Sequence, residues 1–506
     1  MTASALLLAA GCATIDFDYP KTESRHLLDT ADTYLGQEIE PTVAEHPADQ
    51  SGFYPISNGV DALAARLLIA RRAEKSIDAQ YYLIKNDIVG RAFIYSLLAA
   101  ADRGVRVRLL LDDMFATGFD VGLAALDSHP NFEIRIYNPF HRSATGKAQS
   151  ALTGFGRINR RMHNKSFTAD NQITIIGGRN IADEYFGARE DAKFGDLDVV
   201  GIGPVVDDVS NMFDTYWNHP TALPPLAFAK ELDDPQAALD NLRESLSKSN
   251  EEILNSRYAE AVAETIARYV GTRDEIYTWA PYQLVVDSPD KGIKAKAGNA
   301  ASITTPLIEA LRSSEERLVI VSPYFVPLKS GVKFLADLQQ RGVDVTVITN
   351  SLAANNQFTV HGGYAPSRKP LLEAGVKIYE VRPDADVSGT EFVDASGAKA
   401  TLHTKAFLVD DLHSFIGSFN FDPRSANLNT ELGVIIHDAG LARQFSDRVN
   451  ESLKQQTFEV FLNEKGKLRW RGFHNGQETI YEKEPETTWG QRFSAVLARI
   501  MPKSQL

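Results

Sequence analysis

Two short runs of the chain, HNKSFTAD and HTKAFLVD, carry a histidine, a lysine and an aspartate at one spacing. The residues are His163, Lys165 and Asp170 in the first run, and His403, Lys405 and Asp410 in the second. On an extended strand, residues two positions apart point to the same face, so each His shares a face with its Lys. A single His on such a face is more often structural than catalytic. Two copies of the pattern favour chemistry, and we take all six residues as catalytic candidates.

Each run is followed by a tight turn and then by an amide side chain. A Gly-Gly pair precedes Asn180, and a Gly-Ser pair precedes Asn420. If a two-fold axis relates the runs, one pocket would hold two imidazoles, two ammonium groups and two amides. Such a pocket suits an anionic, tetrahedral group with several oxygens, namely a phosphate. Asn180 and Asn420 are therefore phosphate-binding candidates.

Two imidazoles around a phosphate indicate a mechanism with a covalent intermediate. One neutral His attacks phosphorus and forms a phosphohistidine. The other His, protonated, gives its proton to the departing alkoxide and then takes a proton from the incoming hydroxyl. The lysines and the amides would bind the non-bridging oxygens. This scheme requires no metal and no other cofactor, because cationic side chains stabilise the charge.

A third group usually orients a catalytic imidazole, and the repeat offers one acid in each half. The run GDLDVVGIG matches TELGVIIHD, which aligns Asp196 with Glu431 at the head of a strand. We take both as candidates for His-orienting carboxylates. The alternative for either acid alone is a solvated charge at a strand end. Asp170 and Asp410, although part of the motif, are expected to pin the turn after the strand.

The elements around the motifs are also duplicated. RGVRVRLLLDD matches RGVDVTVITNS, and SIDAQYYLI matches LVIVSPYFVP with Ile77 aligned to Ile320. Matching segments in one order at nearly one offset indicate a tandem duplication of a module of roughly 170 to 200 residues. Short apolar runs such as VRVRLLL and VTVIT predict buried strands. GRAFIYSLLAAADRG and GVKFLADLQQRG predict helices that end at Arg-Gly.

The predicted fold class is α/β, with two duplicated domains that each hold a mixed sheet flanked by helices and are related by pseudo-two-fold symmetry. We expect both half-sites in one chain, so a monomer would be complete. The predicted segments are a lipoprotein-like signal (1–12), an N-terminal linker (13–52), the first domain (53–231), a helical connector (232–300), the second domain (301–455) and a C-terminal extension (456–506).

The doubled motif resembles that of the phospholipase D superfamily. Within it, the runs RINRRMHNKSFTAD, FGDLDVVGIG, VHGGYAPSRKPLLEAGVKIYE, HTKAFLVDD and GSFNFDPRSANLNTE look most like the bacterial cardiolipin synthases of the C type. The resemblance implies two such domains with one shared site at their interface. It implies phosphatidyl transfer between phospholipids, with phosphatidylglycerol as a usual acceptor and phosphatidylethanolamine as a second candidate substrate. It also implies that His163, in the first motif, is the nucleophile.

Composition and the chain start suggest where such an enzyme works. The net charge of −13 argues against nucleic acid as a partner. The single cysteine, Cys12, ends an apolar run in LLLAAGC, which resembles a bacterial lipoprotein signal. We therefore expect a protein of the bacterial cell envelope, associated with a membrane surface through lipid on Cys12. The alternative is a signal-like segment with a chance cysteine.

Near the C-terminus, large apolar residues recur at helical spacing. They are Trp489, Phe493, Val496, Leu497 and Ile500. This stripe favours a helix packed on its own domain, with insertion into a bilayer interface as the alternative.

Three functions remain open from the sequence. The first is a phosphatidyltransferase that makes cardiolipin. The second is a hydrolase with the same His-Lys chemistry, either a phospholipase D that releases phosphatidic acid or a nuclease. The third is an envelope lipoprotein that only binds anionic lipid, for which two intact motifs would be unnecessary.

Overall fold

The computed structural model describes residues 15–116, 118–142, 155–189, 191–254, 257–270, 276–292, 302–386, 399–474 and 476–499. Cys12, the expected lipidation site, and Ile500, the last residue of the apolar stripe, lie outside the described residues.

Within the described residues, eighteen strands form one continuous sheet that runs through both modules. The first module supplies β1 (Gln50–Ile56), β2 (Ser76–Tyr81), β3 (Arg106–Asp112), β4 (Phe132–Tyr137), β5 (Ser166–Ala169), β6 (Ile173–Gly177), β8 (Asp198–Ile202) and β9 (Ala222–Leu223). The second supplies β10 (Thr278–Val286), β11 (Arg317–Val321), β12 (Asp344–Asn350), β13 (Lys377–Val381), β15 (Ala406–Val409), β16 (His413–Gly417), β17 (Leu432–Ile436) and β18 (Thr457–Leu462), extended by β19 (Leu468–His474) and β20 (Gln477–Tyr481).

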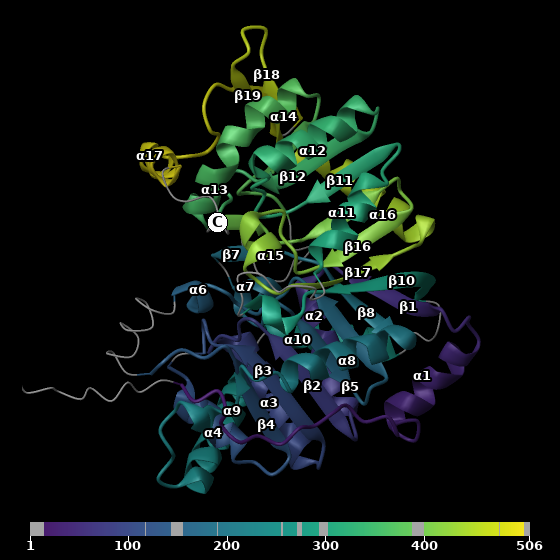
Figure 1. The fold of residues 1–506 in the computed structure, drawn as a ribbon, viewed down its shortest axis with the longest axis vertical. Coiled ribbons are helices and arrows are strands. Elements are labelled where there is room, and N and C mark those ends of the chain that lie inside the picture. The colour runs from purple at the N-terminus through teal and green to yellow at the C-terminus, as the bar shows by residue number, and fades with distance from the viewer. Residues whose placement is uncertain are drawn as a thin grey trace, which may run out of the picture.

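The strand order is the same in both modules when each is read outward from the centre. The first module runs β1, β8, β6, β5, β2, β3, β4, β9, and the second runs β10, β17, β16, β15, β11, β12, β13, β18. Antiparallel pairing of β1 with β10 joins the halves, which lie one above the other in Figure 1. The predicted fold class, two duplicated α/β modules with mixed sheets and a pseudo-two-fold relation, is confirmed.

The sheet register corrects one detail of the predicted repeat. Ile77 lies opposite Ala169 in the first module, and Leu318 lies opposite Val409 in the second. Ile77 is therefore equivalent to Leu318, two positions before the Ile320 that the sequence match proposed. A shift of two residues keeps the same face of the strand, so the apolar pattern alone did not expose the error.

Helices cover both faces of the sheet. They are α1 (Tyr34–Ala44), α2 (Gly59–Arg72), α3 (Ile88–Asp102), α4 (Asp120–Asp127), α6 (Phe155–Ile158), α7 (Asp183–Phe186), α8 (Pro204–Trp217), α9 (Pro235–Leu254), α10 (Arg257–Val270), α11 (Thr304–Arg312), α12 (Leu328–Gln340), α13 (Phe358–Tyr364), α14 (Arg368–Glu373), α15 (Pro423–Asn427), α16 (Ala439–Gln456) and α17 (Trp489–Ala498). Successive residues of β6 therefore enter different cores. Ile175 packs in the core under α2 and α3, and Ile176 packs in the core under α8. The α8 core continues through Val199 and Val434, so it belongs to both modules.

The predicted strand and helix segments of the repeat form as expected. VRVRLLL lies in β3 and VTVIT in β12, and the helices before them, α3 and α12, are followed by Gly104 and Gly342. Both glycines have positive φ, 97° and 96°, which favours glycine after a helix end. In the segment 232–300, α9 packs on α3 and α4, and α10 packs on α2. β10, from the same segment, is the counterpart of β1.

The C-terminal helix α17 does not bury its apolar stripe. Ala495 and Ala498 face α13, where a Cβ on Gly362 would meet the Ala498 Cβ at 2.8 Å. Trp489 and Phe493 are 73% and 49% exposed. The predicted helix does pack on its own domain, against α13, but it docks through its small residues and leaves the large ones exposed. No helix in the described ranges combines the length and the apolar character that crossing a membrane requires.

Candidate active site

The two modules meet at the motifs through matching backbone contacts. The N–H of His163 donates to Thr430 O at 2.9 Å, and the N–H of His403 donates to Gly195 O at 2.7 Å. Next to His403, β7 (Ala192–Gly195) pairs in parallel with β14 (Lys399–Leu402). Each motif thus enters its half-site beside the segment of the other module that carries the candidate acid. His163 and His403 lie just before β5 and β15, not within these strands.

This arrangement pairs each imidazole with the acid of the other module. Nδ1 of His163 lies 2.8 Å from Oε2 of Glu431, and Nδ1 of His403 lies 2.5 Å from Oδ2 of Asp196. Thr430 and Gly195, which bond to the His backbones, immediately precede these acids. Because a carboxylate accepts a hydrogen bond, Nδ1 carries the proton of a neutral ring and Nε2 keeps its lone pair. The geometry therefore leaves both Nε2 atoms as the potential reactive atoms.

The size of the turn residue after each motif fits the size of the acid beside it. A Cβ on Gly178 would lie 2.1 Å from Oδ1 of Asp196, so only glycine leaves room for this carboxylate. At the equivalent position, the hydroxyl of Ser418 donates to Oε2 of Glu431 at 2.5 Å. Ser425 donates to the other oxygen of Glu431 at 2.7 Å. The second half-site therefore holds its acid with two hydroxyls.

Both motif lysines are buried, and each pKa is low for an ammonium group. Lys165 is 2% exposed and Lys405 is 1% exposed. Burial lowers the pKa of Lys165 to about 7 and the pKa of Lys405 to about 8. Nζ of Lys405 lies 3.7 Å from Oδ2 of Asp196, which partly opposes the effect of burial. Two cations so poorly solvated are suited to binding an anion.

The imidazoles are neutral near pH 7. Burial lowers the pKa of His163 to about 4 and that of His403 to about 3, although each partner carboxylate acts in the opposite direction. Lys405 also lowers the pKa of His163, and Lys165 lowers that of His403. These effects across the module boundary show that the four groups share one electrostatic site.

The acids remain ionised in the same site. Burial by itself would raise the pKa of Asp196, but Lys405 and His403 lower it to about 2. Burial also acts to raise the pKa of Glu431, and His163 and Lys165 more than offset this effect. Each half-site therefore contains a carboxylate, a neutral imidazole and a lysine.

The two amides of the predicted phosphate site are buried beside the imidazoles. Asn180 is 3% exposed and Asn420 is 4% exposed. Nδ2 of Asn180 donates to the hydroxyl of Tyr185 at 3.0 Å, and the Tyr185 ring contacts His403. Oδ1 of each Asn is buried without a hydrogen-bond partner among the described residues. Both oxygens are therefore open to a further polar partner.

The motif aspartates face the backbone of their own module. The carboxylate of Asp170 accepts hydrogen bonds from the N–H groups of residues 74–76 at 2.7 to 2.9 Å. Asp410 does the same for residues 315–317 at 2.9 to 3.2 Å. Both have positive φ, 48° and 54°, at the turn of a hairpin. Within the described residues neither bonds to a motif His or Lys, so their contacts are those of a turn anchor.

Comparison with protein families matches residues 68–217 and 307–453 to one family, described as cardiolipin synthase, PLD-like domain. The chain belongs to this family. Its two matched segments carry one His-Lys motif each, and together they build the shared site described above. The resemblance to the phospholipase D superfamily is thereby confirmed.

The relatives support the same assignment. Cardiolipin synthase C of Escherichia coli strain K12 is 41% identical over 473 residues, which cover 92% of this chain and 98% of that protein. An uncharacterized protein of Helicobacter pylori is 31% identical over 511 residues, which cover 98% and 97%. Phosphatidylserine synthase of Haemophilus influenzae superposes with a TM-score of 0.58 at 13% identity, over 92% of this chain and 99% of that one, which supports the fold alone. The chain is thus a cardiolipin synthase homologue with a phospholipase D fold.

The aromatic side chains that surround the two motif histidines were not predicted from the sequence. Tyr82 contacts His163 edge to face, with ring centroids 5.1 Å apart. Around His403, the rings of Tyr185, Phe194 and Tyr324 lie at 4.9, 5.7 and 6.4 Å. A signal was present, because a tyrosine follows the equivalent strand in both modules. Tyr82, rather than Tyr81, contacts the motif His of the first module, as Tyr324 contacts that of the second.

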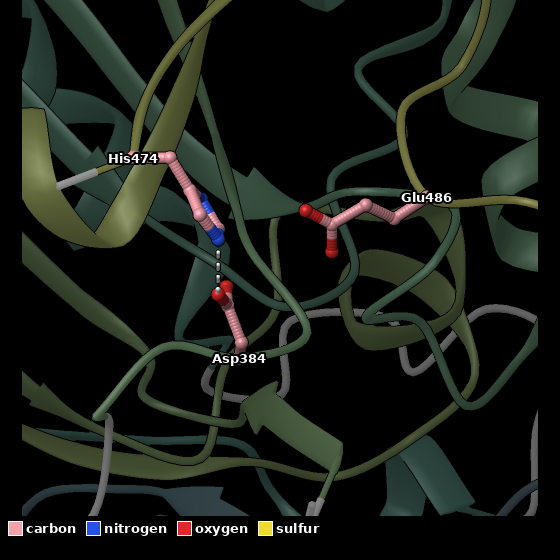
Figure 2. A group of neighbouring side chains, drawn as sticks. All are labelled: Asp384, His474 and Glu486. Atoms are coloured by element: carbon pink, nitrogen blue, oxygen red, sulfur yellow. Dashed lines mark ion pairs between the residues drawn. The ribbon is translucent and has the colours of Figure 1, made fainter. Parts of the chain in front are cut away.

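A second group of side chains has the spacing of metal ligands. Ligand atoms of Asp384, His474 and Glu486 lie within 4.8 Å of one another, and all three residues are exposed (Figure 2). Arg382 donates to Nδ1 of His474 at 2.5 Å and pairs with Asp384 at 2.5 Å. A neutral His474 therefore carries its proton on Nε2, the nitrogen turned toward Asp384. Asp384 and His474 are therefore already joined in a surface ion-pair group with Arg382, and the cluster contains no motif residue.

Proposed function

We propose that this protein is a phosphatidyltransferase that makes cardiolipin from two phospholipids through a covalent phosphohistidine. The main support is the pair of imidazoles in one site, each with Nδ1 bound to a carboxylate of the other module. A transfer with an intermediate needs one nucleophile and one proton carrier, and the two half-sites offer one imidazole for each role. Family membership supports the substrate class.

In the first step, Nε2 of neutral His163 attacks the phosphorus of the donor lipid. The new P–N bond forms while the bond from phosphorus to the headgroup oxygen breaks. His403 donates its proton to this departing alkoxide. In the free site His403 is neutral, and an arriving anionic phosphate raises its pKa, since an opposite charge favours the protonated form.

In the second step, the hydroxyl of the acceptor lipid takes the place of the departed headgroup. His403 removes the proton of this hydroxyl, the oxygen attacks phosphorus, and the P–N bond breaks. Phosphatidylglycerol supplies this hydroxyl, and phosphatidylethanolamine is a second candidate substrate. If water enters instead, the product is phosphatidic acid, so exclusion of water separates the synthase from a hydrolase.

The remaining buried groups stabilise the phosphate in this scheme. Lys165 and Lys405 bind its non-bridging oxygens, and a bound phosphate favours their charged form. The side-chain amides of Asn180 and Asn420 turn by half a rotation, so that their N–H groups face the phosphate. The amide O and NH₂ groups have nearly the same size, so this rotation needs no extra space. Asp170 and Asp410 position the hairpins and do not meet the substrate.

The enzyme works as a monomer on the surface of a membrane in the bacterial cell envelope. Both half-sites come from one chain, which supports the monomer. The exposed Trp489 and Phe493 support contact with lipid. Lipid on Cys12 would add a covalent anchor, because one interfacial element alone gives reversible binding. Nucleic acid does not fit a chain with a net charge of −13.

Incubation of purified protein with phosphatidylglycerol vesicles, with and without phosphatidylethanolamine, tests the proposal. Mass spectrometry of the lipids is expected to show cardiolipin. His163→Ala and His403→Ala should each lower its formation by about a thousandfold or more. His413→Ala, which removes a histidine of β16 outside the site, should leave it unchanged. Phosphatidic acid without cardiolipin would establish a hydrolase instead.

A further inference from the structure

An apolar groove lies between α3, α4 and α9 in the first module. Its volume is about 310 Å³, at the lower end of the range of small-molecule sites. Its apolar lining includes Ile94, Leu111, Phe115, Phe119, Leu123 and Leu246. Phe115 and Phe119 are 45% and 40% exposed, so they form an open apolar rim. Water in such a groove is readily displaced by hydrocarbon.

The inner wall of this groove is also a wall of the active site. Tyr82 lines the groove, and its ring contacts His163 at 5.1 Å between centroids. Asp112 also lines the groove, and its carboxylate accepts the N–H of Met162, the residue before His163, at 2.8 Å. Two independent contacts therefore place the groove one side chain away from the nucleophile.

Among the described residues, the groove is not repeated with the same lining across the pseudo-two-fold axis. One of its sides is α9, which follows β9. In the second module, the chain after the equivalent strand β18 continues as the hairpin β19–β20. The pocket beside this hairpin has a volume of about 260 Å³, and its lining includes the charged Glu484 and Arg492. A separate groove, between α11, α12 and α15, is lined by Leu307, Phe334 and Phe421. His163 thus differs from His403 in having a large apolar surface on one side.

We propose that the groove between α3, α4 and α9 holds an acyl chain of the phosphatidyl group that is transferred through His163. This inference rests on the proposed function and adds the part of the lipid that is recognised. An acyl chain is the occupant because it is apolar and covalently tied to the phosphate, and the groove begins beside the phosphate site. The donor chain stays in the groove while the headgroups exchange, which keeps the phosphohistidine in place between the two steps.

Gly122 on α4 offers a way to fill the groove without disturbing the fold. It lines the groove, and a Cβ built on it meets no atom within 4 Å. Gly122→Leu adds a branched side chain where space exists, and it replaces a glycine inside a helix with a better helix former. Ser330→Leu is the matched control, since it adds the same side chain to α12 at the second groove.

The experiment compares phosphatidylglycerol carrying chains of 16 carbons with phosphatidylglycerol carrying chains of 6 carbons. Gly122→Leu is expected to lower kcat/KM for the long-chain lipid by about tenfold or more, because several buried methylene contacts are lost. The short-chain lipid should change by less than about twofold, and Ser330→Leu should change neither lipid. An equal loss on both lipids, or no loss on the long-chain lipid, would overturn the assignment.

A binding measurement separates the groove from the proposed reaction. The fluorescence of cis-parinaric acid, an 18-carbon fatty acid, is titrated with the wild type and both variants. The wild type and Ser330→Leu should bind it, and Gly122→Leu should bind about tenfold more weakly. Equal binding by the wild type and Gly122→Leu would contradict the proposal that the groove holds an acyl chain. Gly122-dependent binding by a chain that makes no cardiolipin from either lipid would overturn the proposed reaction and leave the acyl site standing.

Discussion

At the level of single residues, each acid bonds to the His of the other module, so replacing Glu431 and replacing Asp196 should affect different steps of the reaction. Glu431 bonds to His163, whereas Asp196, which belongs to the same module as His163, bonds to His403. With a phosphatidyl p-nitrophenyl ester as donor, the leaving group needs no proton. Glu431→Gln should then slow the burst of p-nitrophenol by about a hundredfold or more, because the imidazole loses its orientation. Asp196→Asn should retain the burst and slow later turnover.

Stopped-flow absorbance of p-nitrophenol measures both phases of this reaction. Asp287→Asn is unsuitable as a control, since Asp287 accepts the backbone N–H of Glu431. Asp337→Asn, which alters an exposed ion pair on α12, is suitable. Loss of the burst in Asp196→Asn, together with its survival in Glu431→Gln, would show that His403 is the nucleophile.

Gly178 gives a second prediction at this scale, based on space rather than charge. A methyl group there would lie 2.1 Å from Oδ1 of Asp196 and would force the carboxylate away from His403. Gly178→Ala should therefore lower kcat by about a hundredfold while the protein stays folded. Gly490→Ala, whose Cβ would meet no atom closer than 4.0 Å, is the matched control for steady-state kinetics and circular dichroism. Normal turnover of Gly178→Ala would remove Asp196 from the mechanism.

At the level of elements, α17 presents an apolar surface that its own domain leaves uncovered. The helix is capped by Thr488 and Gln491, so it is well defined although its large residues face solvent. Trp489 and Phe493 stack with centroids 5.2 Å apart, and aromatic pairs of this kind favour the interface of a bilayer.

Replacement of this aromatic pair should weaken contact with lipid. We expect Trp489→Ala/Phe493→Ala to lower binding to phosphatidylglycerol vesicles by about tenfold or more, since each ring buries apolar area in the membrane. Vesicle sedimentation of protein lacking residues 1–14 measures this without any contribution from Cys12. Leu412→Ala removes an exposed apolar residue at the β15–β16 turn and serves as the control. Equal binding of the double variant would show that α17 does not touch lipid.

At the level of the whole molecule, the features that occur in both modules could be predicted from the sequence. The contacts between the two modules could not. The doubled motif, the strands β3 and β12 and the α/β class follow from local patterns, which each module carries in full. Asp196 and Glu431 were found as a pair because they share a position in the repeat. Their exchange between modules was not predictable, since it depends on β7 meeting β14 and on the contact between His163 and Thr430.

The exposed face of α17 escaped prediction for a related reason. A stripe of large apolar residues has the same spacing whether it faces a core or a membrane. What decides the outcome is the partner surface, where Gly362 of α13 accepts only small side chains. The groove beside Tyr82 was hidden as well, because α9 is far from α3 and α4 in sequence and only the fold brings it to them.

The pH dependence of the reaction belongs to the whole molecule, because its charges come from both modules. The pKa of His163 is lowered by burial to about 4, so its imidazole is neutral and nucleophilic above about pH 5. Burial lowers the pKa of Lys165 to about 7 and that of Lys405 to about 8. Since these values lie below that of an ordinary lysine, positive charge is present below pH 7 and is lost as the pH rises through 8.

We therefore expect kcat/KM for the phosphatidyl p-nitrophenyl ester, whose leaving group needs no proton from His403, to be level between about pH 5 and 7. It should fall above about pH 8, because the anionic phosphate loses its cationic partners. The fall is not unfolding caused by these lysines. Between pH 7 and the ordinary lysine pKa, the unfolded chain binds more protons than the folded one, so their contribution to the free energy of unfolding rises with pH. Tryptophan fluorescence at each pH provides the check on folding. A level profile up to pH 10 would show that Lys165 and Lys405 keep ordinary pKa values and that the site is more hydrated than its burial indicates.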